Sequence, residues 1–430
     1  MSRRLGSGVL GALVLGAGLV AAAQQEPPPA SPPPPAQAPA PAQLRPAIPA
    51  AVSAESEAKL RAAFDHVYNL EFAPARELFE QVAQAEPASA TVRAFWASAL
   101  LYEILAYQGS LQTQLFVTSN EFLKHQRLPP DPQLDQRFHA VVREGLELAR
   151  RRLKADPRDV DGLFAAGLLN GDLANYAAGV KAKYLEGLRL GERSYNYHKR
   201  LRALHPELHD TGVVLGVHDY ILGSLPRVHR VFLFFAGVRG SRPRGLGYFE
   251  ETAEKGEFLA PYARILLAVA SIREGQLDRA QGVVEALRAR YPRNPIYALE
   301  LAKLYRRQQN FSEAARVGRE LLADLIAHPH NPRIVGPEDA LLELGLVEDA
   351  EGQPERALET LAQVEKVPDF SKRVWARAVL ERGKIFDRLG QRDLALAEYQ
   401  KVIELAAYPE VTRLAQAFRK KPYQSPAAAN

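Results

Sequence analysis

The chain of 430 residues contains no cysteine, and its only methionine is Met1. Disulfide bonds and lipid attachment through an N-terminal cysteine are therefore excluded, and the main target of oxidation is missing. The sequence has no glycine-rich phosphate loop before a strand, no His-Glu-x-x-His motif and no nucleophile elbow. Its formal net charge is only +5, which is too small to indicate a nucleic-acid-binding protein. These absences give little support to an enzyme.

What the chain does contain is alanine, leucine, arginine and glutamate, with apolar residues at helical spacing and no alternating pattern typical of strands. Two neighbouring segments repeat, because Ala268 and Ala280 recur as Ala302 and Ala314, 34 residues later. One small residue in each helix lets two helices approach closely, and a proline after the pair ends the unit. This period predicts a stack of helical hairpins.

The same signature occurs in Leu60–Pro87, Leu341–Pro368 and Val379–Pro409. Gly345 and Gly383, the small residues of the last two segments, are 38 residues apart, so a short insertion separates these repeats. The five segments together resemble the tetratricopeptide repeat family. We therefore expect an all-α fold, a right-handed α-solenoid of tetratricopeptide-like helix hairpins with inserted helices in the middle. The alternative is an ordinary helical bundle with accidental spacing.

The N-terminus has the features of a secretory signal peptide over residues 1–23. Arg3 and Arg4 precede an uncharged apolar stretch, and small residues before Gln24 offer a cleavage site. The apolar core is short for a membrane span, which needs about 20 residues, although an uncleaved anchor remains the alternative. Residues 24–53 are rich in proline and alanine and predict an extended linker. We expect a secreted or periplasmic protein.

Beyond the linker the pattern divides the chain into N-terminal hairpins at 54–157, an irregular region at 158–256, a C-terminal repeat array at 257–420 and a disordered tail at 421–430. In the irregular region the helical pattern continues but the period is lost. We expect an extra helix over Asn175–Leu190 and an insertion over Ile221–Arg244.

Three stretches of this region carry a second resemblance: Ala174–Tyr176, Gly216–Pro226 and Arg239–Leu246. They are similar to one group of secreted bacterial tetratricopeptide proteins. Parts of the last two stretches are also similar to the eukaryotic tetratricopeptide-39 (inclusion-body clearance) family, although Ser241 stands where that family often has aspartate. Neither resemblance implies a catalytic residue.

Tyrosines gather on the helices that depart from the repeat. A tyrosine offers an apolar ring and a polar hydroxyl, which suits a groove for a peptide or a small ligand. The alternative is that these rings pack between repeats. If a groove exists, its candidate residues are Asn175, Tyr176, Tyr195, His198, Asp219 and Tyr220.

Five of the ten histidines lie between His198 and His229. His205 and His209 have the i, i+4 spacing that can ligate zinc from one helix face. Pro206 lies between them at a predicted helix end, however, so they are not expected to share a regular turn. We expect no metal and no cofactor.

An apolar run with basic flanks occupies the predicted insertion. Phe234 and Phe235 lie between Arg227, Arg230 and Arg239, with no acidic residue inside the run. Such a segment suits a peripheral contact with an anionic membrane surface. The alternative is a buried helix with basic ends.

The interpretation that best fits these patterns is a non-enzymatic secreted or periplasmic scaffold. Its concave face would bind a protein or peptide partner by shape and charge complementarity. The alternative is a periplasmic small-ligand-binding component that serves a transporter. We expect no nucleic-acid partner, and the sequence leaves the oligomeric state open.

Overall fold

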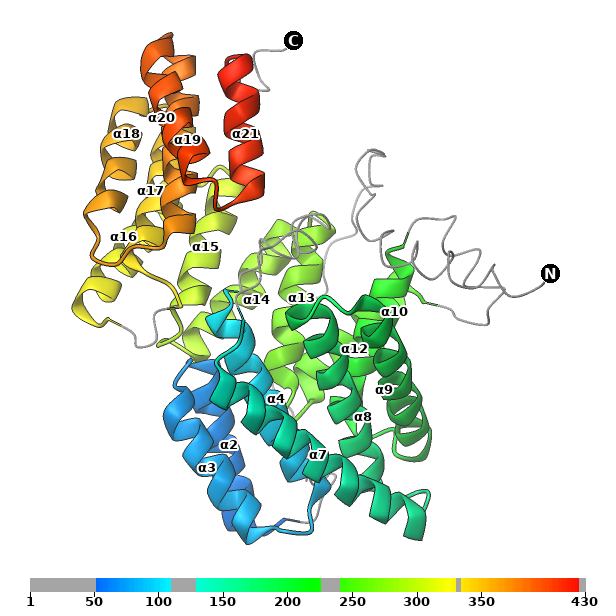
Figure 1. Cartoon of the computed structure of the whole chain (residues 1–430). Helices are drawn as coiled ribbons and strands as arrows, with labels where there is room; N and C mark the ends of the chain where they lie inside the picture. The colour runs from blue at the N-terminus through cyan, green and yellow to red at the C-terminus, as the bar shows by residue number, and fades with distance from the viewer. Residues whose placement is uncertain (1–51, 110–128, 226–239, 330–333, 425–430) are drawn as a thin grey trace, which may run out of the picture.

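The computed structural model describes residues 52–109, 129–225, 240–329 and 334–424 (Figure 1). Within these ranges the chain forms seventeen α-helices and no strand, which confirms the all-α solenoid. The helices pair in chain order into hairpins. The first five hairpins are α2 (Ala54–Tyr68) with α3 (Phe72–Ala85), α4 (Ala90–Tyr107) with α7 (Pro132–Ala155), α8 (Val160–Asn175) with α9 (Tyr184–Leu204), α10 (Gly212–Gly223) with α12 (Arg242–Lys255), and α13 (Ala260–Arg273) with α14 (Leu277–Arg290). The remaining hairpins are α15 (Pro295–Arg307) with α16 (Phe311–Ala327), α17 (Pro337–Ala350) with α18 (Pro354–Ala362), and α19 (Lys372–Arg388) with α20 (Arg392–Leu405), and the helix α21 (Pro409–Lys420) follows them. Three shorter turns complete the described chain: η2 (Tyr176–Val180), η3 (His209–Thr211) and η4 (Gln363–Lys366).

The turn inside each regular hairpin has one residue with a left-handed backbone. Gly275, Gly352 and Gly390 have φ of 76°, 83° and 73°, and Leu70 and Gln309 take the same role with φ of 62° and 60°. Glycine populates this region without steric cost, whereas a residue with a Cβ is strained there. The glycine between the paired helices is therefore a direct consequence of the tight turn.

The small residues of the repeat lie where two helices cross. Ala280, Ala314 and Ala395 are fully buried in the second helices. A Cβ on Gly383 would overlap the ring of Tyr399, so the glycine makes the space that this large side chain fills. The repeat signature in the sequence therefore reports close packing within each hairpin.

The first hairpin packs against the fifth, so the first half of the solenoid closes on itself (Figure 1). Asp65 accepts a hydrogen bond of 2.9 Å from Arg290, and Glu71 accepts one of 2.6 Å from Arg293. Phe64 and Phe258 contact across the same junction with ring centroids 5.7 Å apart. One hydrophobic cluster runs continuously from α2 to α17. Side chains of the described residues therefore pack along much of the inner face of these hairpins.

The irregular middle differs from the prediction in one respect. No separate helix covers Asn175–Leu190: α8 continues through the π-helical turn η2, and α9 already begins at Tyr184. The pattern over 175–190 was helical because it joins the end of one long helix to the start of the next. The α8–α9 pair is thus a hairpin whose helices have 16 and 21 residues, joined through η2.

The second predicted insertion lies mostly outside the described residues, since α10 ends at Gly223, α12 begins at Arg242 and residues 226–239 are not described. The signal peptide and most of the linker also fall outside. None of the helices that the structure describes has the length and apolar character needed to cross a membrane.

Candidate functional site

The six predicted groove residues do not form one site. Asn175 is exposed at the end of α8, whereas Tyr176 is buried against α7. The Tyr176 ring stacks on Phe138 with centroids 5.1 Å apart, and its hydroxyl donates to Asp135. Burial of the ring and the bond to this carboxylate raise the pKa of Tyr176 well above its usual value. Tyr176 therefore joins two helices, as the packing alternative predicted.

His198 is a second core residue. It is completely buried, and its Nδ1 donates to the backbone oxygen of Ser194 at 3.1 Å. Burial lowers the pKa of His198 to about 4, so the ring is neutral at physiological pH. A Cβ on Gly167 would overlap this ring. The histidine thus fills the α8–α9 crossing and does not face a ligand.

Tyr195 does lie in a polar cluster, formed with residues that the sequence interpretation had not grouped. Its ring stacks on His218 with centroids 3.7 Å apart and an interplanar angle of 16°. Nε2 of His218 is 3.4 Å from a carboxylate oxygen of Glu192. Burial lowers the pKa of His218, although Glu192 and Asp219 oppose this effect. The stack closes the space between α9 and α10.

Asp219 is 1% exposed and lies beside this stack. Nη2 of Arg244 donates to its Oδ1 at 2.6 Å, and Nε donates to Oδ2. The bidentate contact raises the pKa of Arg244 above its usual value. A Cβ on Gly245 would lie 2.8 Å from the backbone oxygen of Gly216. Two of the three stretches that carried the second resemblance therefore hold α10 against α12, through an ion pair to buried Asp219 and through two glycines.

Tyr220 forms a separate contact one residue further on. Its hydroxyl donates to Glu274 at 3.0 Å, and Arg242 pairs with the same carboxylate at 3.1 Å. Burial, followed by the charge of Glu274, raises the pKa of Tyr220 to about 12. Tyr195, Asp219 and Tyr220 thus lie near one another around α10, but each is already engaged by a neighbouring side chain.

The histidines at the end of α9 point to different carboxylates. Nδ1 of His205 is 3.0 Å from Glu207, whereas Nδ1 of His209 is 2.9 Å from Glu251. His205 caps α9 and His209 lies in η3, so they do not share a helix face. In the ranges that the structure covers, no three His, Asp or Glu side chains are arranged to hold a metal ion. The predicted membrane-contact residues Arg227, Arg230, Phe234, Phe235 and Arg239 all lie outside the described residues.

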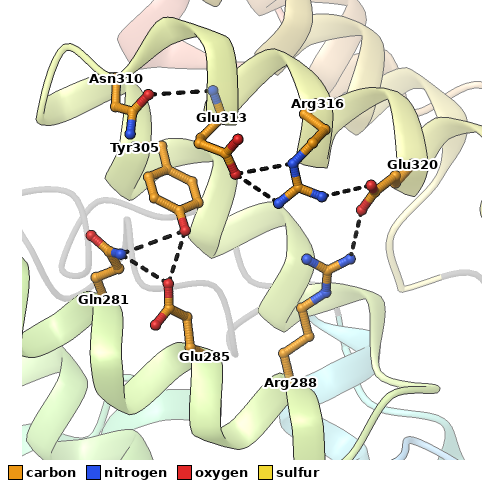
Figure 2. Close-up of polar contacts among 8 residues, drawn as sticks. All are labelled: Gln281, Glu285, Arg288, Tyr305, Asn310, Glu313, Arg316 and Glu320. Carbon is orange, nitrogen blue, oxygen red and sulfur yellow. Dashed lines mark hydrogen bonds and ion pairs between the residues drawn. The ribbon is translucent and has the colours of Figure 1, made fainter.

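The C-terminal array offers a different surface, along the seams between second helices. Figure 2 shows the seam between α14 and α16, where Arg288 pairs with Glu320 at 3.2 Å. Beside it, Tyr305 of α15 donates to Glu285 of α14 at 2.8 Å. Arg316 pairs with Glu320 at 2.6 Å and so extends this network along α16. These polar side chains bridge the seam.

The seam between η4 and α20 is bridged as well, because Arg382 pairs with both Glu365 and Glu398. Between them, α16 and α18 are joined by no hydrogen bond or ion pair within the described chain. That seam instead contains a groove of about 680 Å³. The groove is lined by Leu322, Ile326, Pro337, Leu341, Glu359, Ala362, Gln363, Lys366, Val367 and Pro368.

The groove arises from an early helix end. The helix α16 has 17 residues, whereas α18 has only 9 before the chain tightens into the 3-10 turn η4. The last turn of α16 thus lacks the neighbour that a longer α18 would supply, and Ile326 is 66% exposed. Sequence analysis missed this surface, although the lengthened spacing between Gly345 and Gly383 marks the place.

Comparison with known proteins agrees with the repeat. Residues 339–369, which span α17, α18 and η4, match the family model described as "Tetratricopeptide repeat". No curated protein matches the sequence.

Solved structures with similar folds include PilW, described as a widely conserved type IV pilus biogenesis factor, at 17% identity over 56% of this chain and 94% of that chain, with a TM-score of 0.38. Yeast Tom70 shows 10% identity over 85% of this chain and 88% of that chain, with a TM-score of 0.38. A human IFIT1 dimer with m7Gppp-AAAA shows 13% identity over 85% and 87%, with a TM-score of 0.40. At these identities and TM-scores the likeness carries no conclusion about a ligand or partner of this chain.

Proposed function

We propose that this tetratricopeptide repeat protein is a scaffold that binds an amphipathic helical segment of a partner protein in the groove between α16 and α18. Scaffolds of this repeat class bind protein partners. The observation that carries the proposal is the groove itself. It is a largely apolar surface at the one of three consecutive seams where the described residues form no polar bridge.

The chemistry of the groove fits such a segment. Most of its lining residues are apolar, among them Leu322 and Leu341, and the lining also includes the charged residues Glu359 and Lys366. A volume of about 680 Å³ lies within the range of roughly 300–1,000 Å³ that is usual for binding pockets. An exposed isoleucine at its edge supplies an anchor that becomes buried on binding.

A helix is the occupant that the surroundings favour. The groove lies where another helical turn beside α16 is missing, so an incoming helix would take the place that a longer α18 would have taken. Amphipathic helices bind in such grooves through apolar residues at i, i+3 or i+4, and i+7. Their polar face would remain toward solvent, next to the charged lining residues.

The test compares two exposed apolar residues on second helices of the same array. Ile326→Asp changes the groove, whereas Leu394→Asp changes α20, where Leu394 is 50% exposed and does not line the groove. We expect partners captured from cell extract by the wild-type chain to be retained by Leu394→Asp and lost by Ile326→Asp, with both variants folded by circular dichroism. Equal capture by the two variants would place the binding surface elsewhere.

The location of the scaffold is part of the proposal. The signal peptide over residues 1–23 and the linker over 24–53 would place the repeats in the periplasm or outside the cell, on an extended tether. N-terminal sequencing of the protein from its native host tests this step, with a mature chain that begins at Gln24 as the expected result. A chain that retains residues 1–23 would favour the anchor instead.

A further inference from the structure

The interior of the closed half contains a cluster of tyrosines that the sequence interpretation did not identify: Tyr68, Tyr102, Tyr262, Tyr291 and Tyr297. Tyr68 contacts Tyr102 and Tyr291 with ring centroids 5.9 and 5.3 Å apart. The hydroxyls of Tyr102 and Tyr297 lie close enough to influence each other's pKa. These residues belong to α2, α4, α13, the end of α14 and α15, which meet only because the chain closes on itself.

Asp172 on α8 belongs to the same interior and is 6% exposed. From α4, Ser98 donates a hydrogen bond of 2.7 Å to its Oδ2. From α13, Tyr262 lies near enough for the carboxylate to raise its pKa. Tyr102 follows Ser98 by four residues on α4 and therefore lies on the same face of that helix. Among the described residues, no Lys, Arg or His contributes to the environment that sets the pKa of Asp172.

The other buried aspartates have different environments. Asp219 is paired with Arg244. Asp210 accepts hydrogen bonds from three successive backbone N–H groups at 257–259, and Asp161 accepts two at 90–91 and also pairs with Arg152. A buried carboxylate is costly unless a cation or several donors compensate its charge. Among the described residues Asp172 has a single neutral donor, so it is the buried aspartate of this group whose charge they leave uncompensated.

We propose that Asp172 binds the ammonium group of a primary amine, held on the inner face of the closed half by the carboxylate and by the tyrosines of α4 and α13. An ammonium group has three donors and no acceptor. The carboxylate of Asp172 and the hydroxyls of Tyr102 and Tyr262 are suitable acceptors, and the aromatic rings favour a cation at their faces. Tyr102 and Tyr262 each keep part of their surface exposed, which leaves the group within reach of solvent.

The protonation of Asp172 gives the site a recognisable pH dependence. Burial raises the pKa of Asp172 to about 7, and the bond from Ser98 partly opposes this shift. The carboxylate is therefore about 10% ionised at pH 6 and about 90% ionised at pH 8. An alkylammonium ion is charged at both values, so its affinity is expected to rise about tenfold between them.

The experiment measures binding of n-butylammonium chloride to the full chain by tyrosine fluorescence and by thermal unfolding, with potassium chloride at equal ionic strength as the reference. We expect saturable binding at pH 8 that weakens about tenfold at pH 6. Asp172→Asn should abolish it. Ser98→Ala keeps the carboxylate, so it should retain binding, with the pH dependence moved to higher pH because the bond that lowers the pKa is lost.

A second arm uses Nα-acetyl-lysine amide, which presents the same ammonium group as a lysine side chain in a protein. Comparable affinity for both probes indicates a lysine of a partner protein, and binding of n-butylammonium alone indicates a free amine. No saturable effect of either probe at pH 8, or equal binding by wild type and Asp172→Asn, would overturn the proposal. Neither result bears on the groove between α16 and α18, which is tested separately.

Discussion

Replacing Asp172 by asparagine should stabilise the protein at neutral and alkaline pH even without a ligand. The substitution keeps the size of the side chain and an oxygen that can accept the hydrogen bond from Ser98. It removes only the charge that burial disfavours. The free energy of unfolding of the variant, relative to wild type, is therefore expected to depend on pH.

The sign follows from the direction of the shift. The pKa of Asp172 rises from 3.8 to about 7 on folding. Between these values the folded state binds more protons than the unfolded state, so the stability of the wild type falls as pH rises. Each pKa unit corresponds to about 1.4 kcal/mol, so the loss is on the order of 4 kcal/mol and is complete above about pH 7. Asparagine does not titrate, so the variant escapes this loss.

Chemical denaturation at pH 4, 5, 6, 7 and 8 measures the effect. We expect Asp172→Asn and wild type to have similar stability at pH 4 and to diverge progressively up to pH 7, with the variant more stable. Asp393→Asn is the matched control, because Asp393 is exposed and its substitution should give no such trend. A stability difference that stays constant from pH 5 to pH 8 would refute the assignment of an uncompensated buried charge.

Three further predictions concern how the hairpins are held together. Gly383→Ala should destabilise the C-terminal array, because the new Cβ would overlap the buried ring of Tyr399. Gly282→Ala lies on an open helix surface and should stabilise the folded protein by about 0.5–1 kcal/mol, and thermal unfolding compares the two variants. Phe258→Ala should cost about 3–5 kcal/mol in denaturant unfolding and make the first hairpin susceptible to proteolysis, since this ring joins it to the fifth. Arg244→Ala should cost about 1–3 kcal/mol, because buried Asp219 loses its bidentate partner, and Asp219→Asn in the same background should recover part of that loss at neutral pH.

The hairpins themselves could be read from the sequence because they depend on neighbours. The spacing of Ala280 and Ala314 and the glycines at 275, 352 and 390 report contacts and turns made within some thirty residues. A helix crossing requires small residues and a left-handed turn favours glycine, so both can be recognised from residue types within a single repeat. The same reasoning gave one false element, the helix over 175–190, because a helical pattern does not show where one long helix ends and the next begins.

The candidate site was only partly accessible to such reasoning. Tyr195 and Asp219 were recognised, but their partners His218 and Arg244 lie on other helices and form the contacts that decide their role. The sequence does not distinguish a buried tyrosine from an exposed one, so Tyr176 was assigned to the groove. Whether a residue is buried depends on the side chains that pack over it.

The sequence by itself determined that the chain is a stack of helical hairpins, since that information lies within each repeat. Only the tertiary structure decided that the first hairpin meets the fifth, that α18 ends early beside α16, and that Asp172 lies near Ser98 and Tyr262. The contact between the first and fifth hairpins joins side chains 225 residues apart in the sequence. This closure follows from the accumulated curvature of the stack, to which each hairpin contributes a small rotation that no single repeat reveals.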